Sequence, residues 1–156
     1  KYPSRSDILE VDVDRDRLPF DDGTFDEVYS RCVLEHLQNP NIALKEMIRV
    51  LKRGGKLRLI TDNAGFWAFH TPFSKIHYGG YEMVASHGEQ DMHYSLFTSW
   101  HLENHLRAVG LSDVRIEYID MEEILPSLSV RVVSRLLRFV GLTRIAYPRI
   151  MAEAKK

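Results

Sequence analysis

The sequence has a single cysteine, Cys32, and no run of 18 apolar residues. It also has no Gly-x-Gly pattern, in which two glycines are separated by exactly one residue. A lone cysteine cannot form an internal disulfide, which favours a protein of the reducing cytoplasm. The missing apolar run, together with the polar first residues 1–5, argues against a membrane-spanning helix and a secretory signal. Basic residues number 21 and acidic residues 22, so the basic excess of a nonspecific nucleic-acid-binding protein is missing too.

The 156 residues are enough for one globular domain with a buried core. We find no internal repeat and no linker rich in glycine and serine, so we predict a single domain over residues 1–156. The charge is unevenly distributed within it. Residues 1–35 hold ten acidic and five basic side chains, whereas residues 124–152 hold five arginines and no acid. The two ends of the domain therefore differ in electrostatic character.

The hydrophobic pattern predicts an α/β protein. Asn39 and Pro40 form a helix start signal, and apolar residues at helical spacing follow it until Gly54. A strand follows at once, so residues 25–61 have the length that a crossover between two parallel strands needs. We predict strands at residues 7–13, 25–30, 56–61, 114–118 and 149–154, and helices after Pro40, after Thr98 and over 127–140.

Residues 63–97 are rich in aromatic side chains and histidines and show no clear period. A long segment of this kind more often has a function than serves only as a connection, so we interpret it as a substrate-binding or lid segment.

A basic amphipathic helix is predicted within residues 124–142. Its apolar face consists of Leu128, Val132, Val133, Leu136, Leu137 and Val140, and its other face carries Arg131, Arg135 and Arg138. Such a helix can lie on an anionic membrane or cover an acidic acceptor. The alternative is an ordinary surface helix whose apolar face packs on the sheet or forms a dimer contact.

Three strings in the first 57 residues carry a family resemblance: LPFDDGTFDEV at 18–28, VLEHL at 33–37, and ALKEMIRVLKRGGKL at 43–57. In this order and spacing they resemble the central third of a class I S-adenosylmethionine-dependent methyltransferase of the type 11 kind. The resemblance implies a three-layer Rossmann-like α/β fold with a C-terminal antiparallel strand pair. It also implies methyl transfer from S-adenosylmethionine to a small or medium-sized acceptor.

The resemblance also assigns cofactor-binding residues. An acid just before the first string would accept a hydrogen bond from the adenine amino group, which matches Asp14, or Asp12 if the loop is longer. Backbone around the methionine part of the cofactor matches Ser30, Arg31 and Cys32, with His36 near by. Alternatively, the aspartates are solvated charges, Cys32 is simply buried, and Glu35 and His36 are surface residues of a short helix.

Methyl transfer to an acceptor of high pKa needs a base, and histidine is the usual one. His70, His77, His87 and His93 all lie in the aromatic segment, and we take His77 and His93 as candidates, although each could simply pack there. His87, Glu89, Asp91 and His93 alternate, as ligands on one face of a strand would. Because no recognised metal spacing is matched and Gly88 favours a loop, we predict no metal site.

One part of the family pattern is missing. The family begins its cofactor site with a glycine-rich turn and a ribose-binding acid, and no glycine precedes Gly23 here. Its sheet order is 3-2-1-4-5-7-6, so strand 25–30 would lack its inner neighbour. Either the chain is the C-terminal part of a longer methyltransferase, or residues 7–13 pair with 25–30. We expect weak or no cofactor binding by this chain alone, and a noncatalytic α/β binding module is the alternative function.

Overall fold

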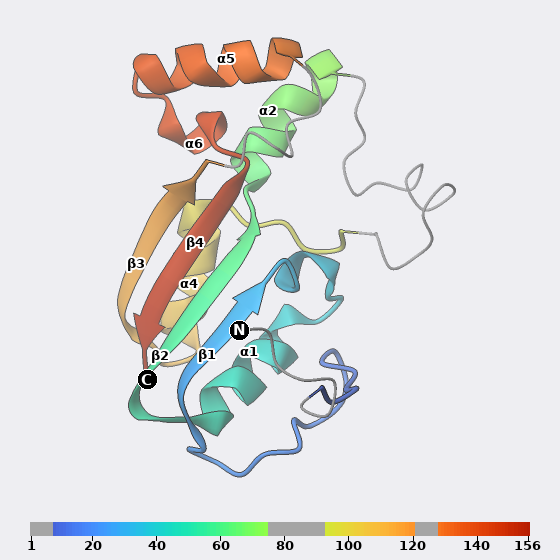
Figure 1. Cartoon of the computed structure of the whole chain (residues 1–156), viewed down its shortest axis with the longest axis vertical. Helices are drawn as coiled ribbons and strands as arrows, with labels where there is room; N and C mark the ends of the chain where they lie inside the picture. Colours follow the sequence, from blue (N-terminus) through green and yellow to red (C-terminus); the bar gives the residue numbers. More distant parts are fainter. Residues whose placement is uncertain (1–7, 75–92, 121–127) are drawn as a thin grey trace.

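The computed structural model describes residues 8–74, 93–120 and 128–156 (Figure 1). The elements follow in the order β1 (Phe25–Arg31), the short 3₁₀ helix η2 (Leu34–His36), α1 (Pro40–Val50), β2 (Leu51–Asp62), α2 (Ala64–Ser74), α4 (Ser99–Ala108), β3 (Ser112–Ile119), α5 (Leu128–Phe139), α6 (Thr143–Ala146) and β4 (Arg149–Lys155). The predicted α/β class is confirmed.

The four strands form one sheet in the order β1-β2-β4-β3. β1 and β2 run parallel, with Ser30 opposite Leu59, because α1 returns the chain to the starting edge of the sheet. β4 runs antiparallel to both β2 and β3. This is the order 4-5-7-6 of the fold that the resemblance implies, and it contains the predicted antiparallel pair.

The strand predicted at residues 7–13 is wrong for the part that the structure describes, because residues 8–13 are not in a strand. Local hydrogen bonding competes with an extended conformation there. The carbonyl of Asp12 accepts from the backbone N–H of Arg15 and Asp16, and its side chain accepts from the N–H of Asp14. The alternative in which this segment pairs with β1 is therefore wrong as well, and β1 stands at the sheet edge of the described chain.

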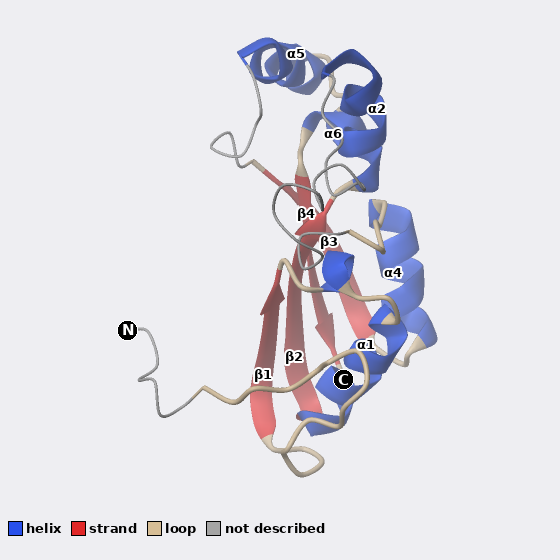
Figure 2. Cartoon of the chain, turned by 90° about the vertical axis from the view of Figure 1, so that its right-hand side faces the viewer, coloured by secondary structure: helices blue, strands red, loops and turns tan. Residues whose placement is uncertain are grey.

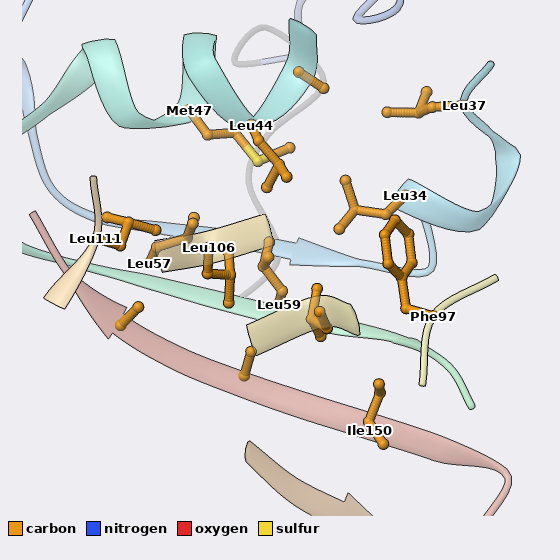
Figure 3. Packing of buried hydrophobic residues seen from close by; sticks show 14 of the residues in the cluster. Leu34, Leu37, Leu44, Met47, Leu57, Leu59, Phe97, Leu106, Leu111 and Ile150 are labelled. Carbon is orange, nitrogen blue, oxygen red and sulfur yellow. The ribbon is translucent and has the colours of Figure 1, made fainter. Parts of the chain in front are cut away.

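Helices α1 and α4 lie on one face of the sheet (Figure 2). The main core fills the space between them and the strands (Figure 3). Leu44 of α1, Leu106 of α4 and Leu59 of β2 are almost completely buried in it. The described residues thus form the sheet and one helical layer.

Helix α1 begins where the sequence predicts, with Asn39 as N-cap and Pro40 in the first turn. It ends at Val50, before the two glycines, because Leu51 is already extended and starts β2. Gly55 is needed for a close approach of two strands. A Cβ atom there would lie 2.9 Å from the carbonyl oxygen of Lys52 and 3.1 Å from that of Asp26.

Helices α2, α5 and α6 gather beyond one end of the sheet, at the top of Figure 1. Asn63, directly after β2, ties this group to the sheet. Its Nδ2 donates to the carbonyl oxygens of Arg144 (2.9 Å) and Tyr147 (2.8 Å), and its Oδ1 accepts from the N–H of Gly65 (3.0 Å). The first part of the aromatic segment 63–97 is thus helical, and residues 75–92 lie outside the described part.

The predicted helix over 127–140 is present as α5, but its apolar face points outward. Val130 and Ser134 are buried, whereas Leu128, Leu136 and Phe139 are exposed. Arg138 explains the orientation, since its guanidinium bonds to Asp120 and lies 4.6 Å above the ring of Tyr147. The interpretation in which the apolar face packs on the sheet is therefore wrong. No helix in the described ranges has the length and apolar character to cross a bilayer.

Candidate active site

Parallel strands β1 and β2 bring their carboxyl ends to the same edge of the sheet, where open α/β proteins bind ligands. Ser30 lies at this edge with 6% of its surface exposed. Its hydroxyl has no hydrogen-bond partner within the described residues. Burial of an unsatisfied hydroxyl is costly, so this group marks a position where a ligand can supply the missing partner.

Glu35, in η2, is buried. Its Oε2 accepts a hydrogen bond from Oγ1 of Thr61 at 2.8 Å, so the side chains of η2 and β2 meet. The backbone carbonyl of Glu35 accepts from the N–H of Ser95, whose hydroxyl donates to the carbonyl of Leu37. The segment after residue 92 is therefore held against η2. The interpretation of Glu35 as a surface residue is wrong, because the chain folds over it.

Asp62 and His93 form the second polar contact of the site. Nδ1 of His93 lies 3.4 Å from Oδ2 of Asp62, and Nε of Arg149 donates to Oδ1 of Asp62 at 3.2 Å. The ring of His36 meets that of His93 edge to face, with centroids 4.6 Å apart. The site thus places a histidine against a buried carboxylate, with an arginine on the other oxygen. This arrangement can orient an imidazole for proton transfer.

Cys32 follows β1 with a positive φ of 54°, and its N–H donates to the carbonyl of Ile60 at 2.8 Å. Burial raises the pKa of its thiol, and the carboxylates of Glu35 and Asp62 raise it further, against the opposing charges of Arg149 and Arg31. The thiol therefore stays protonated at neutral pH and is a poor nucleophile. Its contribution to the site is the sharp turn of the backbone.

The structure places the predicted adenine acids in the loop before β1. Both oxygens of Asp14 accept at 2.9 Å from the backbone N–H groups of Gln38 and Asn39, so this carboxylate ties the loop to the start of α1. Asp12 is exposed and lies 3.7 Å from Arg15. Arg31 is exposed at the end of β1. Their roles toward the cofactor stay predictions.

Two other histidines of the aromatic segment, His77 and His87, lie outside the described residues. His70 is buried against Phe66, and this burial lowers its pKa, although a hydrogen bond to the backbone of Ile145 acts in the opposite direction. Within the ranges that the structure describes, no three side chains of His, Cys, Asp or Glu are placed to share a metal ion. The alternating segment 87–93 is described only at His93.

Sequence reasoning missed Asp62 and Arg149 as members of the site. Asp62 directly follows a predicted strand at its carboxyl end, so the position of a polar residue there was a usable signal. Arg149 begins the last strand, which the family's sheet order places beside β2, but that order does not say which residues stand opposite one another. That pairing, with Arg149 opposite Asp62, is what joins them.

A sheet with a parallel strand pair, an antiparallel last strand and polar groups at the shared carboxyl edge defines the Rossmann-like α/β class. Residues 2–59 match the family described as the methyltransferase domain. The predicted resemblance to the class I S-adenosylmethionine-dependent methyltransferases is thereby confirmed.

Among curated relatives, the ubiquinone/menaquinone biosynthesis C-methyltransferase UbiE of Chromobacterium violaceum is 42% identical over 67 residues. That match covers 42% of this chain and 27% of the relative, so the shared region is about a quarter of the relative's length.

Solved structures extend the likeness of fold to nearly the whole chain. An S-adenosylmethionine-dependent methyltransferase of Thermotoga maritima has a TM-score of 0.60 at 17% identity, covering 95% of this chain and 63% of its own. The phosphoethanolamine N-methyltransferase 2 of Haemonchus contortus, solved with S-adenosyl-L-methionine, has a TM-score of 0.55 at 21% identity. It is covered over 34% of its length and covers 88% of this chain.

Proposed function

We propose that this protein transfers a methyl group from S-adenosylmethionine to a small or medium-sized acceptor, with the reaction at the carboxyl ends of β1 and β2. The observation that carries the proposal is the buried, unsatisfied hydroxyl of Ser30 in β1, near the carboxyl edge of the sheet. It lies at the edge where the matched family implies the cofactor.

The residues at this edge fit such a cofactor. S-adenosylmethionine, when bound, supplies a methyl group activated on a positively charged sulfur. The acidic character of residues 1–35 and the carboxylates of Glu35 and Asp62 favour a cation at this edge. Ser30 and the backbone turn at Cys32 would contact the methionine part, with Arg31 and His36 near by. Asp12 has the more exposed carboxylate for the adenine amine, with one oxygen accepting from the N–H of Asp14, whereas both oxygens of Asp14 accept hydrogen bonds.

His93 is the proposed general base. A carboxylate facing Nδ1 favours the neutral tautomer that carries its proton on that nitrogen, which leaves the lone pair on Nε2. Nε2 can then take the proton that the acceptor loses as its new bond to the methyl carbon forms. Asp62 stabilises the imidazolium that results, and Arg149 holds Asp62 in place. This assignment suits an acceptor with an ionisable O–H, N–H or activated C–H bond.

Cofactor binding is tested first, with the product S-adenosylhomocysteine as a stable probe. Titration into the isotope-labelled chain, followed by amide resonances, should shift the signals of residues 30–37 and 62–63 at millimolar concentration. Affinity in the micromolar range would contradict our expectation that the chain alone binds weakly. No shift at millimolar concentration with the protein expressed from its gene would remove the proposed cofactor site.

Activity is tested with the protein expressed from its gene and incubated with extract fractions and S-adenosylmethionine carrying a deuterated methyl group. A small molecule that gains the labelled methyl group identifies the acceptor. Binding of the cofactor without any labelled product would favour the alternative function, a noncatalytic binding module.

The single Cys32 agrees with a cytoplasmic location, as proposed from the sequence.

The alternative function is a noncatalytic α/β module that binds a partner through the same edge. It is favoured by one observation: the sequence contains no Gly-x-Gly pattern, in which a single residue separates two glycines. The two functions differ in the expected effect of His93→Gln. If His93 is the base, this variant slows methyl transfer to an un-ionised acceptor, whereas a binding module transfers no methyl group in the wild type or in the variant.

A further inference from the structure

Two cavities adjoin where α4, β3 and α6 meet, and we call the hollow that they form the α4–α6 groove. Their volumes are about 340 and 420 Å³, within the range of pockets that bind small molecules. Four residues line both of them: Ser99 and Trp100 of α4, Tyr118 of β3 and Arg144 of α6. Figure 2 shows α6 beyond the upper end of α4.

Hydrogen bonds hold the walls of the α4–α6 groove in place. The hydroxyl of Tyr118 donates to Oγ of Ser99 at 2.8 Å, which joins β3 to the first turn of α4. On the other wall, Asn63 donates to the carbonyl oxygen of Arg144, which holds α6 against the end of β2. Gly65 permits this approach, because a Cβ atom there would lie 2.7 Å from the same carbonyl oxygen. The groove therefore exists without a ligand, which lowers the cost of binding one.

Arg144 brings a positive charge to the groove. Its side chain is exposed, and among the residues that the structure describes it forms no ion pair. Glu103 also lines the groove, but its Oε1 accepts from Nε of Arg107 at 3.0 Å and from Nη2 at 2.8 Å. A guanidinium can hold a carboxylate through two parallel hydrogen bonds. The charged group that fits beside Arg144 is therefore an anion.

Two aromatic side chains supply an apolar surface next to this charge. Trp100 is 71% exposed, although a large aromatic side chain is usually well covered. Tyr118 packs on the core, and its hydroxyl is bonded to Ser99, so it offers its ring to the groove. Aromatic rings bind other flat rings in stacked or edge-to-face arrangements. The groove therefore fits an aromatic ring that carries an acidic group.

We propose that the α4–α6 groove is a second binding site, for a small aromatic carboxylate whose ring stacks on Trp100 and whose carboxylate pairs with Arg144. This site goes beyond the proposed methyl transfer, because it lies on the other face of the sheet from Asp62. Tyr118 and Leu59 both belong to the core between the sheet and α4. Asp62 stands three positions after Leu59 in β2, so the alternation of the strand directs it to the opposite face.

The test is a titration of the isotope-labelled chain with benzoate, followed by amide resonances. We expect saturable shifts at residues 98–101 and 143–145 at millimolar concentration, the strength typical of so small a ligand. Benzamide keeps the ring and lacks the charge, so it should bind about three- to five-fold more weakly. Cyclohexanecarboxylate keeps the charge and lacks the flat ring, so it should bind about five-fold more weakly.

Two variants separate the two contacts. Arg144→Gln should weaken benzoate binding about three- to five-fold and leave benzamide binding unchanged, because only benzoate pairs with the guanidinium. The backbone carbonyl that Asn63 holds is kept in this variant, so α6 stays in place. Trp100→Leu should weaken the binding of both ligands about five-fold, because both stack on the indole.

Matched controls lie elsewhere on the surface. Arg53→Gln removes an exposed arginine from β2, and Tyr29→Leu removes an exposed aromatic side chain from β1. Neither should change the affinity for benzoate, and circular dichroism should show that every variant is folded. These controls separate the groove from a general effect of charge or of aromatic surface.

Three results would overturn the proposal. They are no shift at residues 98–101 at millimolar benzoate, equal affinity for benzoate and benzamide, and weakened binding in a control variant. Displacement of benzoate by S-adenosylhomocysteine would overturn it too, because it would assign benzoate to the cofactor edge. Binding of S-adenosylhomocysteine itself is followed at residues 30–37, so the failure of either proposal leaves the other standing.

Discussion

Nδ1 of His93 lies 3.4 Å from Oδ2 of Asp62, and the two side chains are only 7% and 0% exposed. The other oxygen of Asp62 accepts from Nε of Arg149. A buried carboxylate is costly to ionise unless charged partners compensate it, and Arg149 provides this compensation. The carboxylate can therefore orient the imidazole ring as well as balance its charge.

Asp62→Asn should reduce kcat/KM for methyl transfer about 100-fold, because an amide cannot stabilise the imidazolium that forms on His93. Affinity for S-adenosylhomocysteine should change little. The loss should disappear with an acceptor that is already ionised at the assay pH, since such an acceptor needs no base. Initial rates measured against pH, with two acceptors of different pKa, check this expectation.

His93→Gln should show the same dependence on the acceptor, whereas His101→Gln, on the exposed surface of α4, should leave the rates unchanged. A variant of Asp62 that is equally slow with ionised and un-ionised acceptors would mean that Asp62 has only a structural role.

Ser30→Ala should separate binding from stability. Its hydroxyl is buried without a partner in the described chain, so the free energy of unfolding should stay within about 1 kcal/mol of the wild type or rise. Affinity for S-adenosylhomocysteine should fall about five- to ten-fold if the hydroxyl bonds to the cofactor, since one hydrogen bond is worth about 1 kcal/mol. Denaturant unfolding and calorimetric titration measure the two quantities. Unchanged affinity would remove Ser30 from the site.

Arg49 joins α1 to the loop before β1, and its contribution to stability should depend on pH. Its guanidinium bonds to Glu46 and Asp22, both at 2.8 Å, and donates to the carbonyls of Leu18 and Phe20. The hydrogen bonds to Arg49 hold the pKa of Glu46 below its ordinary value of 4.5, and that of Asp22 below 3.8. Pairing therefore stabilises the fold in full above pH 4.5, and is lost as the pH falls through the lowered pKa values.

Accordingly, Arg49→Met should lower the midpoint of thermal unfolding at neutral pH, and its difference from the wild type should shrink as the pH falls below 4.5. Arg107→Met is the matched control, because Arg107 forms an exposed helical ion pair with Glu103 that contributes little. A difference between Arg49→Met and the wild type that is constant from neutral to acidic pH would show that the carbonyl contacts dominate.

Gly65→Ala should disturb the attachment of the helices beyond the sheet. A Cβ atom on Gly65 would lie 2.7 Å from the carbonyl oxygen of Arg144, which is backbone of α6 and cannot move alone. We expect a destabilisation of about 1–3 kcal/mol, the usual cost of overpacking, measured by denaturant unfolding. Gly110→Ala is a useful comparison, since a Cβ atom there meets no neighbour and only the positive φ of 93° opposes it. Equal stability of Gly65→Ala and the wild type would mean that α6 shifts freely.

Some residues of the candidate site could be predicted from local sequence patterns, and others could not. The sequence predicts His36 near the cofactor and His93 as a base, and the structure brings these two rings into contact, although their roles stay predictions. Asp62 and Arg149 were missed because their meeting depends on the register of β4 against β2, which puts one opposite the other. Register depends on contacts between distant residues, which local spacing does not encode. A surface position for Glu35 stayed an open alternative at the level of sequence, because its burial depends on the segment that folds over η2.

By itself, the sequence determined the parallel unit of β1, α1 and β2, because capping residues, helical spacing and strand patterns act within a few positions of each other. It also determined the family resemblance, whose strings lie in that unit. Only the tertiary structure decided the contact of Asp62 with His93 and the outward direction of the apolar face of α5. An amphipathic pattern states which residues share a face, but the contacts of Arg138 with Asp120 and Tyr147 select the face that turns inward.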